Sequence, residues 1–357
     1  MRTLGFLTFG HWMRGHGSRT VTAGDALTQT IELAVAAEEL GVGGAYMRVH
    51  HFEKSLGAPF PLLAAIGART SRIEIGTAVI PMRYENPLYM AAEAASADLI
   101  SGGRLQLGLS RGSPETALDG AAAYGHPLPA GTSAAEDAQA RAALFRAAIA
   151  GEGMADANPN TTGVPGRLAV QPQSPGLSDR IWWGSGSVGT ASWVGEQGMH
   201  LMSSTLLLEN ADEPFHVIQR RQIDRYRDAY ARSGATVPGR VSVSRSILPV
   251  FDDETSAYFG GRELVAGRDQ VGQIDGFIAR SGRSYVGEPD RIVEELLADE
   301  AVMAADTLTV TVPNQLGVDI NARMLGALME HVVPALRAAS DHRALDAPQD
   351  PVDSSAG

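Results

Sequence analysis

A glycine- and serine-rich turn after a short apolar run is the stretch of this sequence best suited to hold an anion. Residues 181–190 read IWWGSGSVGT, in which Gly184, Gly186 and Gly189 have the G-x-G-x-x-G spacing of a dinucleotide-binding turn. Glycines allow a ligand to approach the backbone, and the N–H groups at the start of the following helix attract negative charge. Three side chains could add hydroxyl hydrogen bonds: Ser185, Ser187 and Thr190.

Three interpretations of this turn are open. A dinucleotide site would use Glu209 as the acid that binds a ribose, because it stands near the required spacing. A monophosphate site would use the turn and its hydroxyl groups alone. An ordinary strand-to-helix turn would use a serine as the helix cap and bind nothing. The dinucleotide fingerprint normally opens the first βαβ unit of its domain, whereas four β-like runs precede this one, so the monophosphate is favoured.

Two adjacent histidines, His50 and His51, close an apolar run and are candidates for proton transfer, because imidazole titrates near neutral pH. Neighbouring strand residues point to opposite sides, so both rings are not expected to face one site. That geometry and the lack of a third ligand at suitable spacing argue against a metal site, and none is predicted. The alternative for either histidine is a purely structural role.

Arg111 is the second candidate for phosphate binding. It follows the run 104–109 and precedes Gly112, and a guanidinium can bind a phosphate through two hydrogen bonds. The alternative is a surface salt bridge.

The elements that must position these residues alternate between short β-like runs and helical patterns, which is typical of parallel βαβ construction. Eight such runs, each followed by a helical segment, predict an α/β fold, a (β/α)₈ TIM barrel. In that fold the ends of the strands meet at one face, so the histidines, Arg111 and the glycine turn would come together. The runs are 3–9, 44–49, 73–80, 104–109, 181–183, 199–203, 240–250 and 306–312.

The chain is longer than an average barrel of about 250 residues, and the surplus is expected in loops after the fourth and seventh strands. The predicted insertions are 113–135, 151–180, which has room for a small hairpin, and 253–287. We predict one barrel domain over residues 1–338, and a polar, disordered tail over 339–357.

Composition excludes several classes of function. The net charge of −12 argues against nucleic-acid binding, and the absence of cysteine excludes disulfides and thiolate chemistry. No run approaches about 18 apolar residues, the length of a membrane span. The first ten residues resemble a strand more than a signal peptide, so a cytoplasmic location is expected.

Six segments of the chain together resemble the bacterial luciferase-like family of flavin-dependent monooxygenases. They agree with the family in content, order and spacing, and cover most of the chain. They are HHF at 50–52, GTAVIP at 76–81, NPLYMAAEAASADLISGGRLQLGLSRG at 86–112, IWWGSGSVGTASWVGEQG at 181–198, YVGEPDRIVEELL at 285–297 and LMEHVVPALR at 328–337.

The resemblance implies roles for particular residues. His50 is similar to the active-site histidine beside the flavin, and the Ala78–Val79 peptide to a non-prolyl cis bond behind the flavin ring. Segment 253–287 is similar in position to a mobile loop that shields the site. The expected cofactor-binding residues are Ala78, Val79, Ser110, Arg111, Gly184, Gly186, Ser187 and Thr190.

The implied reaction is oxygenation of a small organic substrate by O₂ and reduced FMN, through a C4a-peroxyflavin, with the reduced FMN supplied by a separate flavin reductase. Two alternatives stay open: an F420-dependent reductase or dehydrogenase on the same barrel, and a non-catalytic flavin-binding protein. The resemblance also favours a homodimer. Many members carry an acidic residue where this chain has Val49, which argues against a mechanism that needs a carboxylate there.

Overall fold

The computed structural model describes residues 1, 3–15, 17–112, 116–207, 212–262, 268–274 and 277–345. Glu209, parts of the insertions 113–135 and 253–287, and the tail from residue 346 lie outside the described residues. No helix in the described part of the chain has both the length and the apolar character to cross a membrane.

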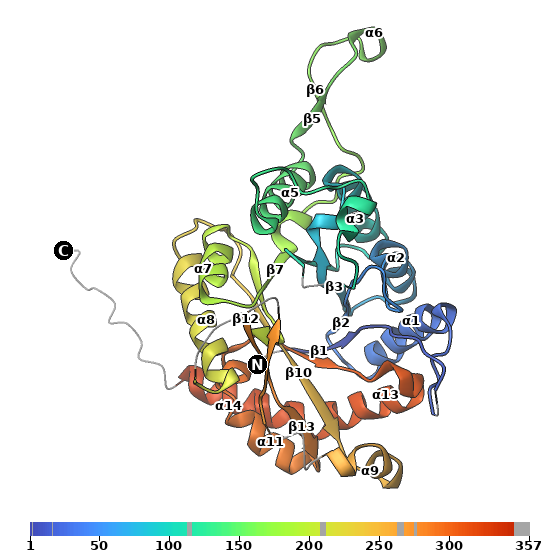
Figure 1. The fold of residues 1–357 in the computed structure, drawn as a ribbon, viewed down its shortest axis with the longest axis vertical. Helices are drawn as coiled ribbons and strands as arrows, with labels where there is room; N and C mark the ends of the chain where they lie inside the picture. The colour runs from blue at the N-terminus through green and yellow to red at the C-terminus, as the bar shows by residue number, and fades with distance from the viewer. Residues whose placement is uncertain are drawn as a thin grey trace, which may run out of the picture.

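Eight parallel strands form a closed barrel, which confirms the predicted (β/α)₈ fold (Figure 1). Each strand pairs with its neighbour along the chain, and the ring closes because β14 pairs with β1 and β10 pairs with both β8 and β14. Each of the eight predicted runs overlaps a barrel strand. The strands are β1 (Thr3–Thr8), β2 (Gly44–Met47), β3 (Glu74–Pro81), β4 (Leu105–Ser110), β7 (Ile181–Ser185), β8 (His200–Ser203), β10 (Val241–Pro249) and β14 (Thr307–Thr311).

Helices cover the outside of the barrel, and the main hydrophobic core lies between them and the strands. Capping boxes begin two of these helices: Thr22 with Asp25, and Ser133 with Glu136. The larger helices are α1 (Ala23–Glu39), α2 (Pro59–Arg69), α3 (Pro87–Ile100), α5 (Ala134–Ile149), α7 (Val188–Glu196), α8 (Phe215–Tyr230), α11 (Pro289–Leu297), α12 (Glu300–Ala304), α13 (Gly317–Ala327) and α14 (Val333–Leu345), the last two joined by a π-helical turn, η5 (Leu328–Val332).

The last helix corrects the predicted start of the tail. Disorder was expected from residue 339, but α14 continues to Leu345. Ser340 explains part of this extension, because its hydroxyl donates to the carbonyl of Leu336 at 2.8 Å and accepts from the N-terminal ammonium of Met1 at 2.6 Å. A contact between the two ends of the chain is not visible in local sequence pattern.

Inside the barrel, side chains occupy the middle level and part of the N-terminal level. Arg240 pairs with Glu74 at 2.8 Å, and the Tyr46 hydroxyl donates to the same carboxylate at 3.0 Å. Leu7, Tyr46, Trp182 and Met202 form a small apolar cluster within the ring of strands. These side chains leave space at the C-terminal ends of the strands and a separate cavity at the N-terminal end of the barrel.

Two insertions interrupt the regular alternation. The first insertion follows β4 and begins with a short helix, α4 (Gly120–Ala123), and the longer helix α5. A hairpin of β5 (Gly153–Asp156) and β6 (Arg167–Ala169) comes next, with α6 (Pro159–Thr162) at its tip, and η2 (Leu177–Arg180) then leads into β7. The second insertion follows β10. It consists of α9 (Asp253–Phe259), η3 (Gly260–Arg262), the antiparallel pair β11 (Gln270–Ile274) and β12 (Phe277–Ser281), and β13 (Ser284–Gly287). Strand β13 pairs with the outer half of β10. Strand β12 also pairs with β9 (Leu206–Leu207), the segment that follows β8.

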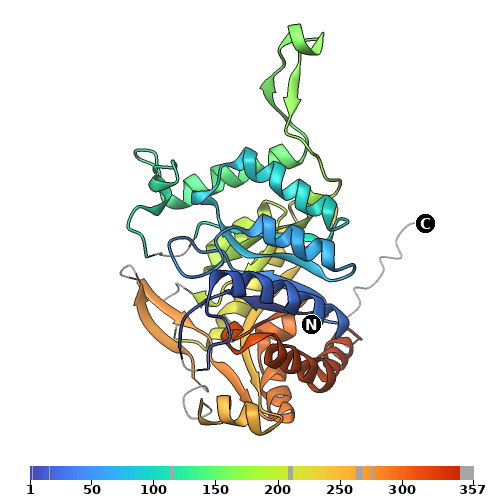
Figure 2. The ribbon, with the colours of Figure 1, turned by 90° about the vertical axis from the view of Figure 1, so that its right-hand side faces the viewer.

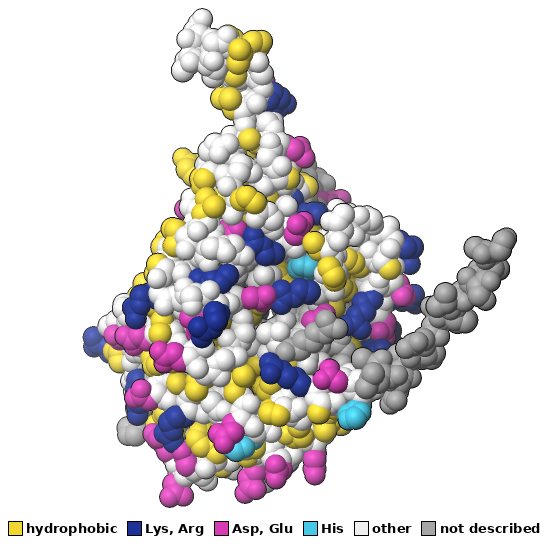
Figure 3. Space-filling view, turned by 180° about the vertical axis from the view of Figure 1, so that it is seen from behind, with side chains coloured by type: hydrophobic (Ala, Val, Ile, Leu, Met, Phe, Trp, Pro, Cys, Tyr) yellow, Lys and Arg dark blue, Asp and Glu magenta, His cyan; other side chains and the backbone are white. Residues whose placement is uncertain are grey.

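The β5–β6 hairpin is an arm that projects away from the barrel (Figures 1 and 2). None of residues 151–171 is buried, and Val164 and Leu168 are exposed. Figure 3 shows the arm standing clear of the body with apolar side chains on its surface.

Because the arm buries no side chain, its removal is expected to leave the stability of the barrel almost unchanged. Replacing residues 155–168 by an Asn-Gly turn, which keeps Met154 in its contact with the main core, should alter the free energy of unfolding by less than about 1 kcal/mol. Urea denaturation followed by circular dichroism measures the difference. A loss of several kcal/mol would show that the arm packs against protein in solution.

Candidate active site

A cavity of about 570 Å³ opens at the C-terminal ends of the barrel strands. All eight residues predicted to bind a cofactor line it, which are Ala78, Val79, Ser110, Arg111, Gly184, Gly186, Ser187 and Thr190. They come from the ends of β3, β4 and β7 and from the start of α7. The structure therefore brings together residues that lie more than a hundred positions apart in the sequence, whereas His50 is not among the lining residues.

The turn between β7 and α7 is built as a helix N-terminus that faces this cavity. Ser187 is the N-cap of α7, and its hydroxyl oxygen accepts from the N–H of Thr190 at 3.3 Å. The two hydroxyl groups of Ser187 and Thr190 lie 3.0 Å apart. The capping role expected of a plain turn is thus present, and the same turn also directs the positive end of the helix dipole at the cavity.

Glycine at two positions of this turn keeps space open. A Cβ atom on Gly184 would lie 3.3 Å from Val79 Cγ1 and 3.5 Å from Ser110 Cβ, so a side chain there would take up room between two walls of the cavity. A Cβ on Gly186 would lie 2.9 Å from the carbonyl oxygen of Leu206. Larger residues at either position would narrow the cavity or displace its wall.

The charge of the lining favours an anionic ligand. Three arginines line the cavity, Arg48, Arg83 and Arg111, and the lining residues include no aspartate or glutamate within the described chain. Arg111 is exposed, and its Nε donates to the carbonyl of Gly112 at 3.4 Å. No acidic side chain of the described residues lies within ion-pair distance of Arg111, so the alternative of a surface salt bridge finds no partner there.

The peptide bond between Ala78 and Val79 is cis, which confirms the expectation from the resemblance. The pairing register of β3 with β4 shifts between Thr77 and Ile80 at this point. Both Ala78 and Val79 face the cavity, where they form part of an apolar wall with Leu7 and Met202.

The two histidines lie in different environments. His50 stacks near Phe9, with ring centres 6.3 Å apart, whereas His51 packs against Tyr84 and Tyr124 at 4.3 and 5.0 Å. Burial lowers the pKa of each imidazole to about 4, helped by the charge of Arg48 at His50 and of Arg83 at His51. Both rings are therefore neutral at pH 7.

Sequence reasoning missed one wall of the cavity, which is rich in hydroxyl groups. Ser242 and Ser244 alternate with Val241 and Val243 along β10, so the serines face into the barrel and the valines face the helices. The hydroxyl of Thr309 donates to that of Ser244 at 2.8 Å. This period of two in VSVS at 241–244 is a signal that could have identified the wall.

Arg48, Arg83 and Gln139 were also missed. No motif marks them, because they reach the cavity from a loop after β2, a turn after β3 and the helix α5.

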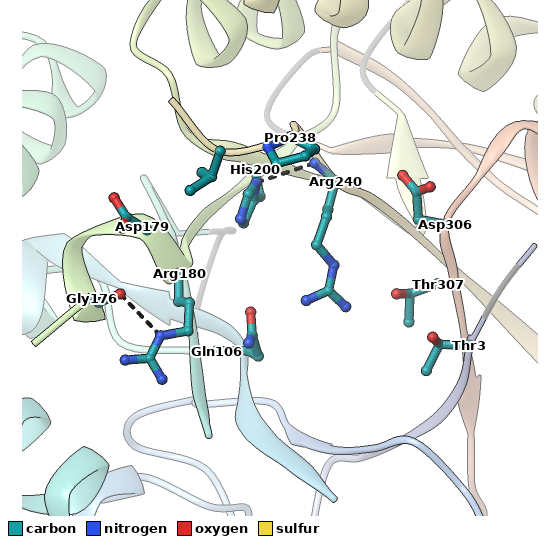
Figure 4. Close-up of a pocket in the computed structure, with 11 residues that line it drawn as sticks. Thr3, Gln106, Gly176, Asp179, Arg180, His200, Pro238, Arg240, Asp306 and Thr307 are labelled. Carbon is teal, nitrogen blue, oxygen red and sulfur yellow. Dashed lines mark hydrogen bonds between the residues drawn. The ribbon is translucent and has the colours of Figure 1, made fainter. Parts of the chain in front are cut away.

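A second cavity, of about 520 Å³, lies at the N-terminal end of the barrel and contains none of the predicted site residues (Figure 4). Arg240 and Arg180 line it, but Arg240 is paired with Glu74 and Arg180 with Asp98, each at 2.8 Å. The His200 Nδ1 accepts from the backbone N–H of Arg240 at 3.2 Å, as Figure 4 shows. Burial and the charge of Arg240 lower the pKa of His200 to about 4. These mutually satisfied groups fit a structural role, as is usual for this end of such barrels.

Comparison with known proteins supports the same picture. The trigonelline monooxygenase oxygenase component of Acinetobacter baylyi, a flavin-dependent enzyme, is 23% identical over 330 residues, which is 86% of this chain and 89% of that protein. An F420-dependent glucose-6-phosphate dehydrogenase of Kribbella flavida is 29% identical over 174 residues, covering 47% and 50% of the two chains.

Many solved structures share the fold, and two of them illustrate the likeness. The oxygenating constituent of 3,6-diketocamphane monooxygenase from Pseudomonas putida, in complex with FMN, superposes with a TM-score of 0.67 at 17% identity, over 94% of this chain and 99% of the other. The F420-dependent tetrahydromethanopterin reductase of Methanopyrus kandleri superposes with a TM-score of 0.63 at 16% identity, over 94% of this chain and 99% of the other. At such identities the likeness concerns the fold alone.

The model of the luciferase-like monooxygenase family matches residues 1–304, from the first barrel strand to α12, the helix that precedes the last barrel strand β14. Its members named above use a flavin or F420 on this barrel. With that match, this chain belongs to the luciferase-like monooxygenase family of oxidoreductases.

Proposed function

We propose that this protein is the oxygenase component of a two-component flavin-dependent monooxygenase. It would bind reduced FMN delivered by a separate reductase and use O₂ to oxygenate a small organic substrate. The observation that carries this proposal is the convergence of all eight expected cofactor residues on one cavity. The wide match to an oxygenase component of a flavin-dependent monooxygenase supports it.

The residues present fit an FMN. Arg111, Ser187 and Thr190 would hold the phosphate, because they combine a charge with no acidic partner in the described chain and two hydroxyl groups at a helix N-terminus. The apolar surface of Ala78 and Val79 would support the ring, and the absence of a side chain at Gly184 leaves room beside it.

The bound flavin would supply two electrons for the cleavage of O₂, with one oxygen atom entering the substrate and the other leaving as water. The protein's own task is to orient the reactants and exclude water. We assign part of the latter task to the β11–β12 hairpin, the orange strands in Figure 2. Its β12 pairs with Leu206, which lines the cavity, so movement of the hairpin would be transmitted to the cavity wall.

The alternative is hydride transfer with F420. The match to an F420-dependent dehydrogenase over about half of the chain favours it as the second candidate. The same phosphate-binding groups would serve either cofactor, so the choice depends on whether the protein acts with oxygen.

The reaction of reduced FMN with oxygen separates the two candidates. Free reduced FMN is mixed rapidly with air-saturated buffer, with or without excess protein, and the return of oxidised flavin absorbance is followed. A monooxygenase is expected to slow this return at least about tenfold, because a closed site shields the flavin from water. An unchanged rate, together with reduction of F420 by a substrate, would contradict the proposal. A homodimer and a cytoplasmic location stay predictions.

A further inference from the structure

We propose that Arg48, and not His50, is the residue after β2 that faces the bound cofactor, and that its charge favours the reduced, anionic flavin over the oxidised one. The inference rests on the proposed function, since it concerns the flavin in the same cavity. It reassigns the role that the sequence resemblance gave to His50.

The first step is the position of the two side chains. Arg48 lines the cavity together with Ala78 and Val79, whereas His50 does not. Arg48 Nε donates to His50 Nε2 at 2.8 Å, and the Arg48 Cζ lies 5.5 Å from the centre of the Phe9 ring. The imidazole therefore supports the arginine, and the arginine contacts the ligand space.

The second step is the protonation of His50. Because its Nε2 accepts a hydrogen bond, the proton of the neutral ring is on Nδ1, which has no hydrogen-bond partner among the described residues. The charged or titratable groups around it are Arg48, His11, His51 and Glu53, the last with Oε2 at 3.9 Å from Nδ1.

Burial lowers the pKa of His50 to about 4, and the charge of Arg48, as well as that of His11 and His51 when they are protonated, acts in the same direction. Protonation at Nε2 would also break the bond from Arg48. At pH 7 His50 is therefore neutral, and its Nε2 is not available to donate a proton to a ligand.

The third step is electrostatic. The ring of oxidised FMN is neutral, and that of reduced FMN carries a negative charge when deprotonated. An arginine at a partly enclosed cavity interacts with a charged ring more strongly than with a neutral one. A charge-assisted hydrogen bond of this kind corresponds to about a tenfold or larger preference for the anionic form.

The first measurement that tests this inference uses the protein without flavin. Nuclear magnetic resonance titration of the imidazoles in the flavin-free protein compares the parent with Arg48→Met. The parent His50 is expected to titrate near pH 4, and the variant at clearly higher pH, because a positive neighbour and its hydrogen bond are lost. A His50 that titrates identically in both would overturn the arrangement of the two side chains.

The second measurement gives the dissociation constants of oxidised and reduced FMN in the absence of oxygen. Arg48→Met is expected to reduce the preference for reduced FMN about tenfold or more, and Arg48→Lys to keep most of it. His50→Gln is expected to leave the preference within about twofold, because the glutamine amide oxygen can still accept the hydrogen bond from Arg48. Arg69→Met, an exposed arginine at the end of α2, is the matched control.

Loss of the preference in His50→Gln but not in Arg48→Met would overturn this inference alone. A parent that binds neither form of FMN would overturn the proposed function, and this inference with it.

Discussion

Replacing Asp299 with asparagine is expected to destabilise the protein by about 3–5 kcal/mol. Asp299 and Arg245 are both buried and joined at 2.8 Å, and the hydroxyl of Tyr285 donates to the same carboxylate. The asparagine is neutral, so the guanidinium of Arg245 would stay buried without a countercharge. Urea denaturation of parent and variant measures the difference.

The acid dependence of stability tests the same pair. Burial raises the pKa of Asp299, but the charge of Arg245 and the hydrogen bonds to the carboxylate together lower it by more than burial raises it. The pKa of Asp299 therefore lies below its usual value. The unfolded chain therefore binds the proton more readily than the folded one. The contribution of Asp299 to stability is fully present above about pH 4 and is lost as the pH falls below that value.

A matched control is the exposed pair of Arg220 and Asp224 on α8. Asp224→Asn should change the free energy of unfolding by less than about 1 kcal/mol. The double replacement of Arg245 by methionine and Asp299 by leucine should recover much of the stability lost in the single variant, since no charge stays buried. If Asp299→Asn were no less stable than Asp224→Asn, the claim that the buried ion pair stabilises the fold would be contradicted.

Replacing Arg111 with methionine is expected to weaken FMN binding by about 1.5–3 kcal/mol, or roughly 10- to 150-fold. Methionine keeps much of the length of the side chain but removes the charge. The expectation follows from the position of Arg111 at the same cavity as the capped N-terminus of α7. Fluorescence titration measures the dissociation constants.

Riboflavin, which lacks the phosphate, is the control ligand. The parent should bind FMN more tightly than riboflavin, and the variant should lose most of this difference while its riboflavin affinity changes little. Arg69→Met should bind both ligands like the parent. If the Arg111 variant lost affinity for FMN and for riboflavin equally, the result would indicate damage to the cavity and no contact between Arg111 and the phosphate.

The barrel could be predicted from sequence because its strands carry short apolar runs bounded by glycine and polar residues. The predicted run 73–80 and the observed β3, Glu74–Pro81, differ by one residue at each end. Motifs at strand ends then converge through the geometry of the fold, which is why Arg111 and Ser187 could be assigned to one face before their contacts were known.

The parts that could not be predicted depend on contacts between distant segments. The pairing of β9 with β12 joins Leu206 to Ser281, and the segments have no periodic pattern of their own. The role of Arg48 depends on its hydrogen bond to His50 and on the direction in which each side chain points after β2 ends at Met47. A pair of histidines at a strand end draws attention in the sequence, whereas the arginine two positions earlier belongs to no motif.

The most direct test of the proposed function is a titration of the purified parent protein, without oxygen, with reduced FMN, oxidised FMN and F420. We predict that reduced FMN binds most tightly, because a cationic cavity holds both its phosphate and its anionic ring. Tighter binding of F420 than of either form of FMN would contradict the account and would indicate hydride transfer.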